Sequence, residues 1–303
     1  MEADLKVKRN IKGLFLFSGG LDSILAVKIL QQQKIKVIGV AFVTYFWRGN
    51  IAQKSAQNIH LPLVKVYLGQ EYLKIIRQSK FGYGSGINPC LDCRILMLKK
   101  AKNIFQKKKF DFIATGEVLG ERPMTQNRQA MKLIERESGL SGYLLRPLSA
   151  KLLPPTILEE KGLINREKLL SIQGRSRKPQ IGLAQKLGIA YYPSPAGGCI
   201  LCEKEYARKL RNLLNKKEKV NSKDIKLLRI GQHFWLNQDQ TEVIVGRNYR
   251  ENQRLGQLAK INEKLIEPDY PAPSVLIRGK INQSAIKFAW DKINENKKNS
   301  KTN

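Results

Sequence analysis

The stretch Ser18-Gly19-Gly20-Leu21-Asp22-Ser23 decides the fold of this chain. It stands between an apolar segment, residues 12–17, that predicts a strand and a segment with helical spacing, residues 23–33. Glycines at such a turn let backbone N–H groups converge, and the N-terminus of the following helix adds a partial positive charge. The two serines supply hydroxyl donors, whereas the carboxylate of Asp22 would repel a phosphate and therefore predicts a bridging Mg²⁺. We interpret this stretch as a phosphate-binding loop.

Strand and helix patterns alternate through the first part of the chain. The predicted strands cover residues 12–17, 35–44, 63–68 and 110–115, and the predicted helices cover 23–33, 50–60, 71–79 and 91–106. Such alternation is typical of βαβ units and a parallel sheet. Residues 1–214 are expected to form this α/β domain, residues 222–290 a small α+β domain, and residues 291–303 a disordered polar tail.

Composition narrows the class of protein. The 303 residues include 55 Lys and Arg against 25 Asp and Glu, a formal net charge of +30 spread along the whole chain. A surface this basic predicts a polyanionic partner such as RNA, although compositional bias explains the charge equally well. No apolar run is long enough to span a membrane, and the N-terminus has no secretory signal pattern. Four cysteines are too few for a disulfide scaffold, so a cytoplasmic protein is expected.

The four cysteines form two C-x-x-C pairs, Cys90-Leu91-Asp92-Cys93 and Cys199-Ile200-Leu201-Cys202. Two such turns can close a structural zinc site. They can equally form a redox dithiol that carries a persulfide, or hold an iron–sulfur cluster. The spacing alone leaves these three interpretations open.

The loop over residues 18–23 resembles the SGGxDS signature of the PP-loop family of N-type ATP pyrophosphatases. The resemblance implies an adenine nucleotide alpha hydrolase-like, Rossmann-like domain with a five-stranded parallel sheet between two layers of helices. It also implies that ATP is cleaved between its α- and β-phosphates. The residues expected to bind ATP are Ser18, Gly19, Gly20, Leu21, Asp22, Ser23, Ala41, Phe42, Thr115 and Gly116.

Residues 88–93 (Asn-Pro-Cys-Leu-Asp-Cys), the helix that follows and residues 111–116 resemble the tRNA-thiolating PP-loop enzymes, namely the 2-thiouridylases and 4-thiouridine synthetases. In cluster-dependent members three cysteines hold a [4Fe–4S] cluster, which here implies Cys90, Cys93 and Cys199. In cluster-free members the cysteines at the positions of Cys93 and Cys199 form a persulfide pair. Cys202 departs from the three-ligand pattern, and a fourth ligand there would favour zinc.

This resemblance implies an ATP-dependent tRNA sulfurtransferase with Asp22, Cys93 and Cys199 as catalytic residues. The sulfur would come from sulfide or a cysteine desulfurase, and a homodimer is compatible with this assignment. Two rival functions are a 7-cyano-7-deazaguanine synthase-like enzyme with a zinc site and a non-enzymatic, zinc-stapled RNA-binding protein with a vestigial loop. Measuring the turnover of ATP to AMP and analysing tRNA nucleosides would separate them.

Basic residues in predicted loops are candidate RNA contacts. Gly246-Arg247-Asn248, in the small domain, resembles the RNA-binding module at the end of NFACT proteins, which implies that Arg247 contacts phosphate. A solvated surface run explains the other basic residues equally well. The candidates are Arg146, Lys151, Arg175, Arg177 and Arg247.

Overall fold

The computed structural model describes residues 11–194, 198–236 and 241–299. The chain divides into two compact units, the first formed by residues 1–84 and 88–199 and the second by residues 85–87 and 200–303. The sequence predicts a domain boundary after residue 214. The structure places the division earlier, so that the helix beginning at Lys204 belongs to the second unit. No helix within the described residues is long and apolar enough to cross a membrane.

A five-stranded parallel sheet forms the centre of the first unit, as predicted. Its strand order is β3-β2-β1-β4-β5. The strands are β1 (Lys12–Leu16), β2 (Lys36–Thr44), β3 (Leu63–Leu68), β4 (Phe112–Thr115) and β5 (Leu144–Leu145). Because β1 pairs with β2 on one side and β4 on the other, the strand order reverses at β1. Ligands of open α/β sheets bind at the carboxyl ends of the strands at such a reversal.

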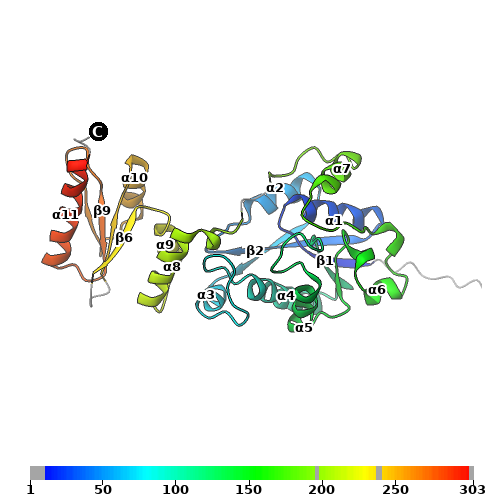
Figure 1. Ribbon diagram of the computed structural model, residues 1–303. Helices are drawn as coiled ribbons and strands as arrows, with labels where there is room; N and C mark the ends of the chain where they lie inside the picture. The colour runs from blue at the N-terminus through cyan, green and yellow to red at the C-terminus, as the bar shows by residue number, and fades with distance from the viewer. Residues whose placement is uncertain (1–10, 195–197, 237–240, 300–303) are drawn as a thin grey trace, which may run out of the picture. The chain divides into compact units, whose positions relative to one another are not determined.

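Helices cover both faces of this sheet (Figure 1). One layer contains α1 (Leu21–Gln32), α2 (Asn50–Asn58) and α7 (Lys178–Lys186). The other contains α3 (Gln70–Arg77), α4 (Cys90–Lys107) and α5 (Arg128–Ser138). Three short elements follow β5, namely η1 (Ala150–Leu152), α6 (Ile157–Glu160) and η2 (Arg166–Lys168). The near-continuous apolar sequence of β1 and β2 is explained by burial on both faces.

The second unit contains a four-stranded antiparallel sheet with the order β6-β7-β9-β8. Alternation along β7 places Val243 and Val245 in one core with α11 and Ile244 in another with α9 and α10. The sheet is therefore covered by helices on both faces. The elements are η3 (Ile200–Cys202), α8 (Lys204–Lys216), α9 (Ser222–Leu227), β6 (Gln232–Leu236), β7 (Thr241–Val245), α10 (Tyr249–Leu258), β8 (Lys264–Ile266), β9 (Val275–Arg278) and α11 (Gln283–Asn299).

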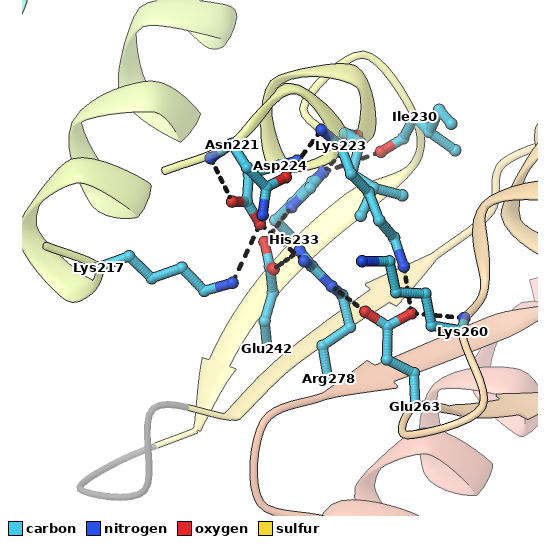
Figure 2. A network of polar contacts seen from close by, with 11 residues as sticks. Lys217, Asn221, Lys223, Asp224, Ile230, His233, Glu242, Lys260, Glu263 and Arg278 are labelled. Carbon is cyan, nitrogen blue, oxygen red and sulfur yellow. Dashed lines mark hydrogen bonds and ion pairs between the residues drawn. The ribbon is translucent and has the colours of Figure 1, made fainter. Parts of the chain in front are cut away.

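A buried network of charged side chains joins the elements of the second unit (Figure 2). The guanidinium of Arg278 donates to Glu263 at 2.9 Å, to Glu242 at 2.8 Å and to Asp224 at 2.7 Å. Nδ1 of His233 lies 2.8 Å from the carboxylate of Glu242. Because each buried carboxylate faces a cation, the network ties α9 to β6, β7 and β9.

A capping box at Asn221 and Asp224 starts α9, which extends to Leu227. The expected disordered tail is helical from residue 291 to 299, where α11 continues and buries Ile293 in the core. Residues 300–303 lie outside the described residues.

Candidate functional site

The predicted phosphate loop is held in place by its own backbone and by α2. Gly19 has a φ of +80°, and a Cβ at this position would lie 2.6 Å from Cα of Ala52, so a side chain would collide with the helix. The hydroxyl of Ser55 donates to the carbonyl oxygen of Gly19 at 2.8 Å. The glycine is therefore required both for the turn and for its approach to α2.

The start of α1 presents N–H groups next to the two loop serines. No side chain caps the helix at Gly20, whose N–H donates to Oγ of Ser18 at 3.3 Å. The hydroxyl of Ser23 donates back to the carbonyl oxygen of Gly20 at 2.8 Å. An uncapped helix N-terminus that follows a glycine turn is suited to an anion.

A cavity of about 150 Å³ opens beside this loop. It brings together the predicted nucleotide residues Ser18, Ala41 and Phe42, from the carboxyl ends of β1 and β2. Trp47 forms part of its wall and donates from its indole N–H to the carbonyl oxygen of Phe42 at 3.1 Å. The other lining residues are Leu16, Phe17, Val40, Gly49, Ala52, Arg94 and Met97.

The end of β4 packs directly against the beginning of α1. A Cβ on Gly116 would lie 2.7 Å from both N and Cα of Ser23, so only glycine fits at this contact. Thr115 is buried, and its hydroxyl donates to Glu117 at 3.0 Å. Gly116 is thus next to the phosphate loop as expected, whereas Thr115 serves to hold Glu117.

Charged residues gather around Asp22 at the first turn of α1. Its Oδ1 atom is buried and makes no hydrogen bond among the described residues. Burial raises the pKa of Asp22, and the Arg177 guanidinium partly offsets this effect. Burial and the Asp22 charge also raise the pKa of Glu121. Arg177, predicted to bind RNA, therefore lies at the phosphate loop.

The donor set around Asp22 fits Mg²⁺. This ion is usually bound by one or two carboxylates together with substrate phosphates. Asp22 supplies a buried carboxylate oxygen without a hydrogen bond among the described residues, and its charge acts on the neighbouring carboxylate of Glu121, whose pKa it helps to raise. Both groups would hold the ion between the loop and the phosphates that it binds.

Glu117 lies between two guanidinium groups. Its Oε1 is 3.1 Å from Nε of Arg94, and its Oε2 is 3.0 Å from Nε of Arg146. Burial opposes ionisation of Glu117, but Arg94 and Arg146 outweigh it and keep its pKa below the usual value. Arg146 also pairs with Glu135, and its side chain is only 2% exposed. The prediction that Arg146 contacts RNA is therefore wrong, because two carboxylates hold it in the interior.

Three of the four cysteines share one neighbour, the buried side chain of Tyr72. Burial raises the pKa of Tyr72, and the thiols of Cys93, Cys199 and Cys90 raise it further. The Tyr72 hydroxyl is buried, and it has no hydrogen-bond partner of good geometry among the described residues. Burial likewise raises the pKa of Cys93, while the Tyr72 hydroxyl and the Arg94 guanidinium lower it.

The predicted ligand set is thus partly brought together. Cys90, Cys93 and Cys199 belong to the first unit, whereas Cys202 belongs to η3 of the second. Within the described ranges no three His, Cys, Asp or Glu side chains are grouped closely enough to hold a metal ion. Cysteine thiolates are the usual ligands of iron–sulfur clusters, so the three thiols near Tyr72 are donors of the right kind, although the described part of the structure does not gather them into a metal site.

The remaining candidate RNA contacts are on the surface. Lys151 pairs with Glu167 at 2.9 Å, and Arg175 is exposed. In the second unit Arg247 is held by Glu251 and keeps 47% of its side chain exposed. Contact between these three basic residues and RNA stays a prediction.

A larger cavity of about 740 Å³ lies elsewhere in the first unit, against α5 and β5. Arg146 and Glu135 border it, but neither the phosphate loop nor a cysteine does. We therefore place the candidate site at the smaller cavity, where the predicted residues converge.

Sequence reasoning missed three residues that build this site, namely Trp47, Tyr72 and Arg94. Arg94 follows directly after Cys93, so its position in the sequence was a usable signal. Trp47 and Tyr72 pack edge to face with ring centroids 5.1 Å apart, which only the fold reveals.

Comparison with known proteins supports the sequence-based assignment. No family model matches the chain. It is 31% identical over 139 residues to the tRNA-specific 2-thiouridylase MnmA of Karelsulcia muelleri (strain GWSS). This match confirms the resemblance to the tRNA-thiolating PP-loop proteins. The matched region covers 41% of this chain. The chain spans about a third (34%) of the length of that curated relative. The NFACT-like character of the second unit stays a prediction.

Three solved structures show a low similarity to the chain. A predicted subunit of tRNA methyltransferase from Methanocaldococcus jannaschii gives a TM-score of 0.34 at 15% identity and covers 45% of this chain and 69% of its own. A 4-thiouridine synthetase in complex with RNA and ATP gives a TM-score of 0.37 at 18% identity, and the match covers 72% of this chain and 52% of that one. NMN synthetase from Francisella tularensis gives a TM-score of 0.35 at 10% identity, and the match covers 86% of this chain and 90% of that one. The fold assignment here rests on the observed strand order.

Proposed function

We propose that this chain is an ATP-dependent tRNA sulfurtransferase that adenylates a uridine carbonyl oxygen and replaces it with sulfur. The observation that carries the proposal is that Cys93 and Arg94 are adjacent residues on α4. Arg94 lines the cavity that contains Ser18, while the thiol of Cys93 adjoins Tyr72 and the other two cysteines. A nucleotide site and a sulfur site would therefore meet at one helix turn. The similarity to a tRNA-specific 2-thiouridylase supports the same assignment.

The first half-reaction would use the phosphate loop. The uridine carbonyl oxygen attacks the α-phosphorus of ATP, a new P–O bond forms, and the bond to pyrophosphate breaks. The N–H groups at the start of α1 would stabilise the negative charge on the leaving pyrophosphate. Asp22, with Glu121 beside it, would hold the Mg²⁺ that neutralises the same phosphates.

The second half-reaction would replace oxygen with sulfur. Hydrosulfide adds to the activated carbon, the C–O bond to AMP breaks, and AMP leaves with the original uridine oxygen. Cys90, Cys93 and Cys199 would hold a [4Fe–4S] cluster, which when bound supplies an iron with an open coordination position for sulfide. The buried hydroxyl of Tyr72 would keep water away from these thiols.

A basic surface would bind the tRNA. The net charge of +30 favours a polyanion, and the binding would weaken steeply with salt. In the second unit, Arg247 and the 74% exposed ring of Tyr249 offer a phosphate contact and a stacking platform. A base must leave its stack to reach a cavity. A tRNA substrate would also place the protein in the cytoplasm, with sulfide or a cysteine desulfurase as its sulfur donor.

Anaerobic purification and one assay test the proposal. The protein is mixed with ATP, Mg²⁺, sulfide and tRNA from a strain that lacks the corresponding gene, and tRNA nucleosides are analysed by mass spectrometry. We expect a thiouridine together with AMP and pyrophosphate, bound iron in the purified protein, and loss of product in Cys93→Ala. AMP formation without a thionucleoside would contradict the proposed function, and zinc in place of iron would contradict the cluster.

A further inference from the structure

The cavity beside the phosphate loop contains one charged lining side chain, Arg94. The other residues of its wall are apolar, aromatic, glycine or serine. Only 27% of the Arg94 side chain is exposed, so its charge is partly removed from water. A half-buried cation at the wall of an apolar cavity favours an anionic ligand, because charge pairs are stronger where water is excluded.

A chain of ion pairs holds Arg94 in this position. Nε of Arg94 faces Oε1 of Glu117 at 3.1 Å, and Oε2 of Glu117 accepts from Nε of Arg146 at 3.0 Å. Arg146 is anchored in turn by Glu135. The pair with Glu117 engages the inner nitrogen of Arg94, so the outer nitrogens of its guanidinium fork can bind a second anion.

The position of Arg94 also indicates which part of a nucleotide it would meet. Adenine and ribose are neutral, so they give a guanidinium no charge to pair with. The β- and γ-phosphates are expected on the loop that contains Ser18 and at the start of α1. Arg94 lies on a different element, α4, directly after Cys93. The α-phosphate, which remains on AMP, would then lie between these two places.

We propose that Arg94 binds the α-phosphate of the nucleotide and holds the adenylyl group beside Cys93. This inference rests on the proposed function, because it deepens the same site. Glu117 and Arg146 are positioning residues: they orient Arg94 and do not themselves contact the nucleotide, since both are 2% exposed.

Nucleotide binding to the full-length protein tests this role. Trp47 forms part of the cavity wall, so quenching of its fluorescence reports binding, and calorimetry provides a second measure. The probes are ATP, AMP and adenosine, each measured with wild type, Arg94→Ala and Arg94→Lys. Lys99→Ala is the matched control, because it removes one positive charge from an exposed position on α4.

We expect Arg94→Ala to weaken ATP and AMP binding at least tenfold and adenosine binding less than twofold. Arg94→Lys should recover part of the AMP affinity, and Lys99→Ala should bind all three ligands as wild type does. Arg94→Ala still leaves Glu117 paired with Arg146, so thermal unfolding should show an intact fold. Wild-type AMP affinity in Arg94→Ala would overturn the proposal, and so would an equal loss for adenosine.

The outcome separates this inference from the proposed function. If Arg94 is required for AMP binding but no thionucleoside forms, the proposed function fails and the assignment of Arg94 stands. If a thionucleoside forms while Arg94→Ala binds AMP normally, the proposed function stands and the assignment of Arg94 fails.

Discussion

Nε of Arg146 donates to Oε2 of Glu117 at 3.0 Å, and each side chain is only 2% exposed. Removing Arg146 takes away one of the two guanidinium groups that face Glu117 and also the partner of Glu135. Breaking a buried pair in this way costs about 3–5 kcal/mol. We therefore expect Arg146→Met to lower the free energy of unfolding by about this amount in chemical denaturation. Arg136→Met, at a 72% exposed position, should change it by less than about 0.5 kcal/mol.

A second substitution tests whether the cost comes from the unpaired charge. The double variant Arg146→Met/Glu117→Leu removes both charges of this pair, and replacing a buried pair by apolar groups is often close to neutral. Arg94 and Glu135 lose these partners, but both are partly exposed to water. We expect the double variant to be more stable than Arg146→Met alone. A double variant as unstable as the sum of both single variants would show that packing, not charge, is responsible.

The contact of Gly116 with the start of α1 couples the stability of the sheet to the function of the loop. A Cβ there would lie 2.7 Å from the backbone of Ser23, so Gly116→Ala must displace either β4 or the start of α1. We expect loss of ATP binding, measured by calorimetry, together with a destabilisation of about 1–3 kcal/mol. Gly182→Ala is the control, because open space surrounds that helical glycine, and it should stabilise the protein by about 0.5–1 kcal/mol.

Asp22 should destabilise the fold at neutral pH, because burial raises its pKa. A carboxyl group whose pKa is raised by folding stabilises the protein only while protonated, and this contribution is lost as pH rises through the folded pKa. Asp22→Asn should therefore raise stability at pH 7 by about 1 kcal/mol, and the gain should vanish as pH falls below the ordinary aspartate pKa. The same variant should lose AMP formation. Equal stability of both proteins at pH 7 would contradict this account.

The parallel sheet and its loop could be predicted from the sequence because their signals are local. Apolar segments with short period, amphipathic segments and a glycine turn each occupy a few adjacent residues. The converging wall of Ser18, Ala41 and Phe42 follows from the parallel strand order, which sends all carboxyl ends to one edge. β5 was missed because it has only two residues, too few to show a period.

Side chains whose role depends on distant partners could not be predicted in this way. In the sequence Arg146 cannot be distinguished from a surface cation, because its partners Glu117 and Glu135 lie next to it only in the folded chain. Arg94 likewise resembles an exposed helix residue until β1 and β2 form the opposite wall of its cavity. The helix α11 did leave a usable signal, because Ala285, Ala289 and Ile293 recur at every fourth position and are all fully buried.

The network around Arg278 predicts a dependence of stability on pH in the second unit. Burial opposes the ionisation of Asp224 and Glu263, but hydrogen bonds and ion pairs, including those from Arg278, keep the pKa of both below the usual values. These groups therefore stabilise the fold above their ordinary pKa values and lose this effect as pH falls through the lowered ones. Arg278→Met should cost about 3–5 kcal/mol at pH 7 and less near pH 4.

Tryptophan fluorescence can locate this loss in one unit. In a Trp47→Phe background the remaining tryptophans, Trp235 and Trp290, both belong to the second unit. Their unfolding transition should shift in Arg278→Met and should be unchanged by Arg136→Met in the first unit. A deficit for Arg278→Met that is constant from pH 7 to pH 4 would contradict the charge-based explanation.

The exposed face of α10 gives the last prediction, which concerns RNA binding by the second unit. Tyr249 is 74% exposed, and Arg250 follows it at another exposed position. Base stacking is worth about 1–3 kcal/mol per aromatic ring and does not depend on salt, whereas each phosphate contact contributes roughly 0.7 to the slope of log K against log salt for a single strand. Tyr249→Ala should therefore weaken binding of single-stranded RNA at every salt concentration without changing the slope. Arg250→Ala should reduce the slope, and Lys264→Ala, at an exposed position on β8, should change neither quantity. Fluorescence anisotropy of a labelled oligonucleotide over a salt series measures both quantities. A slope that falls in all three variants alike would show that only the diffuse positive charge of this unit binds RNA.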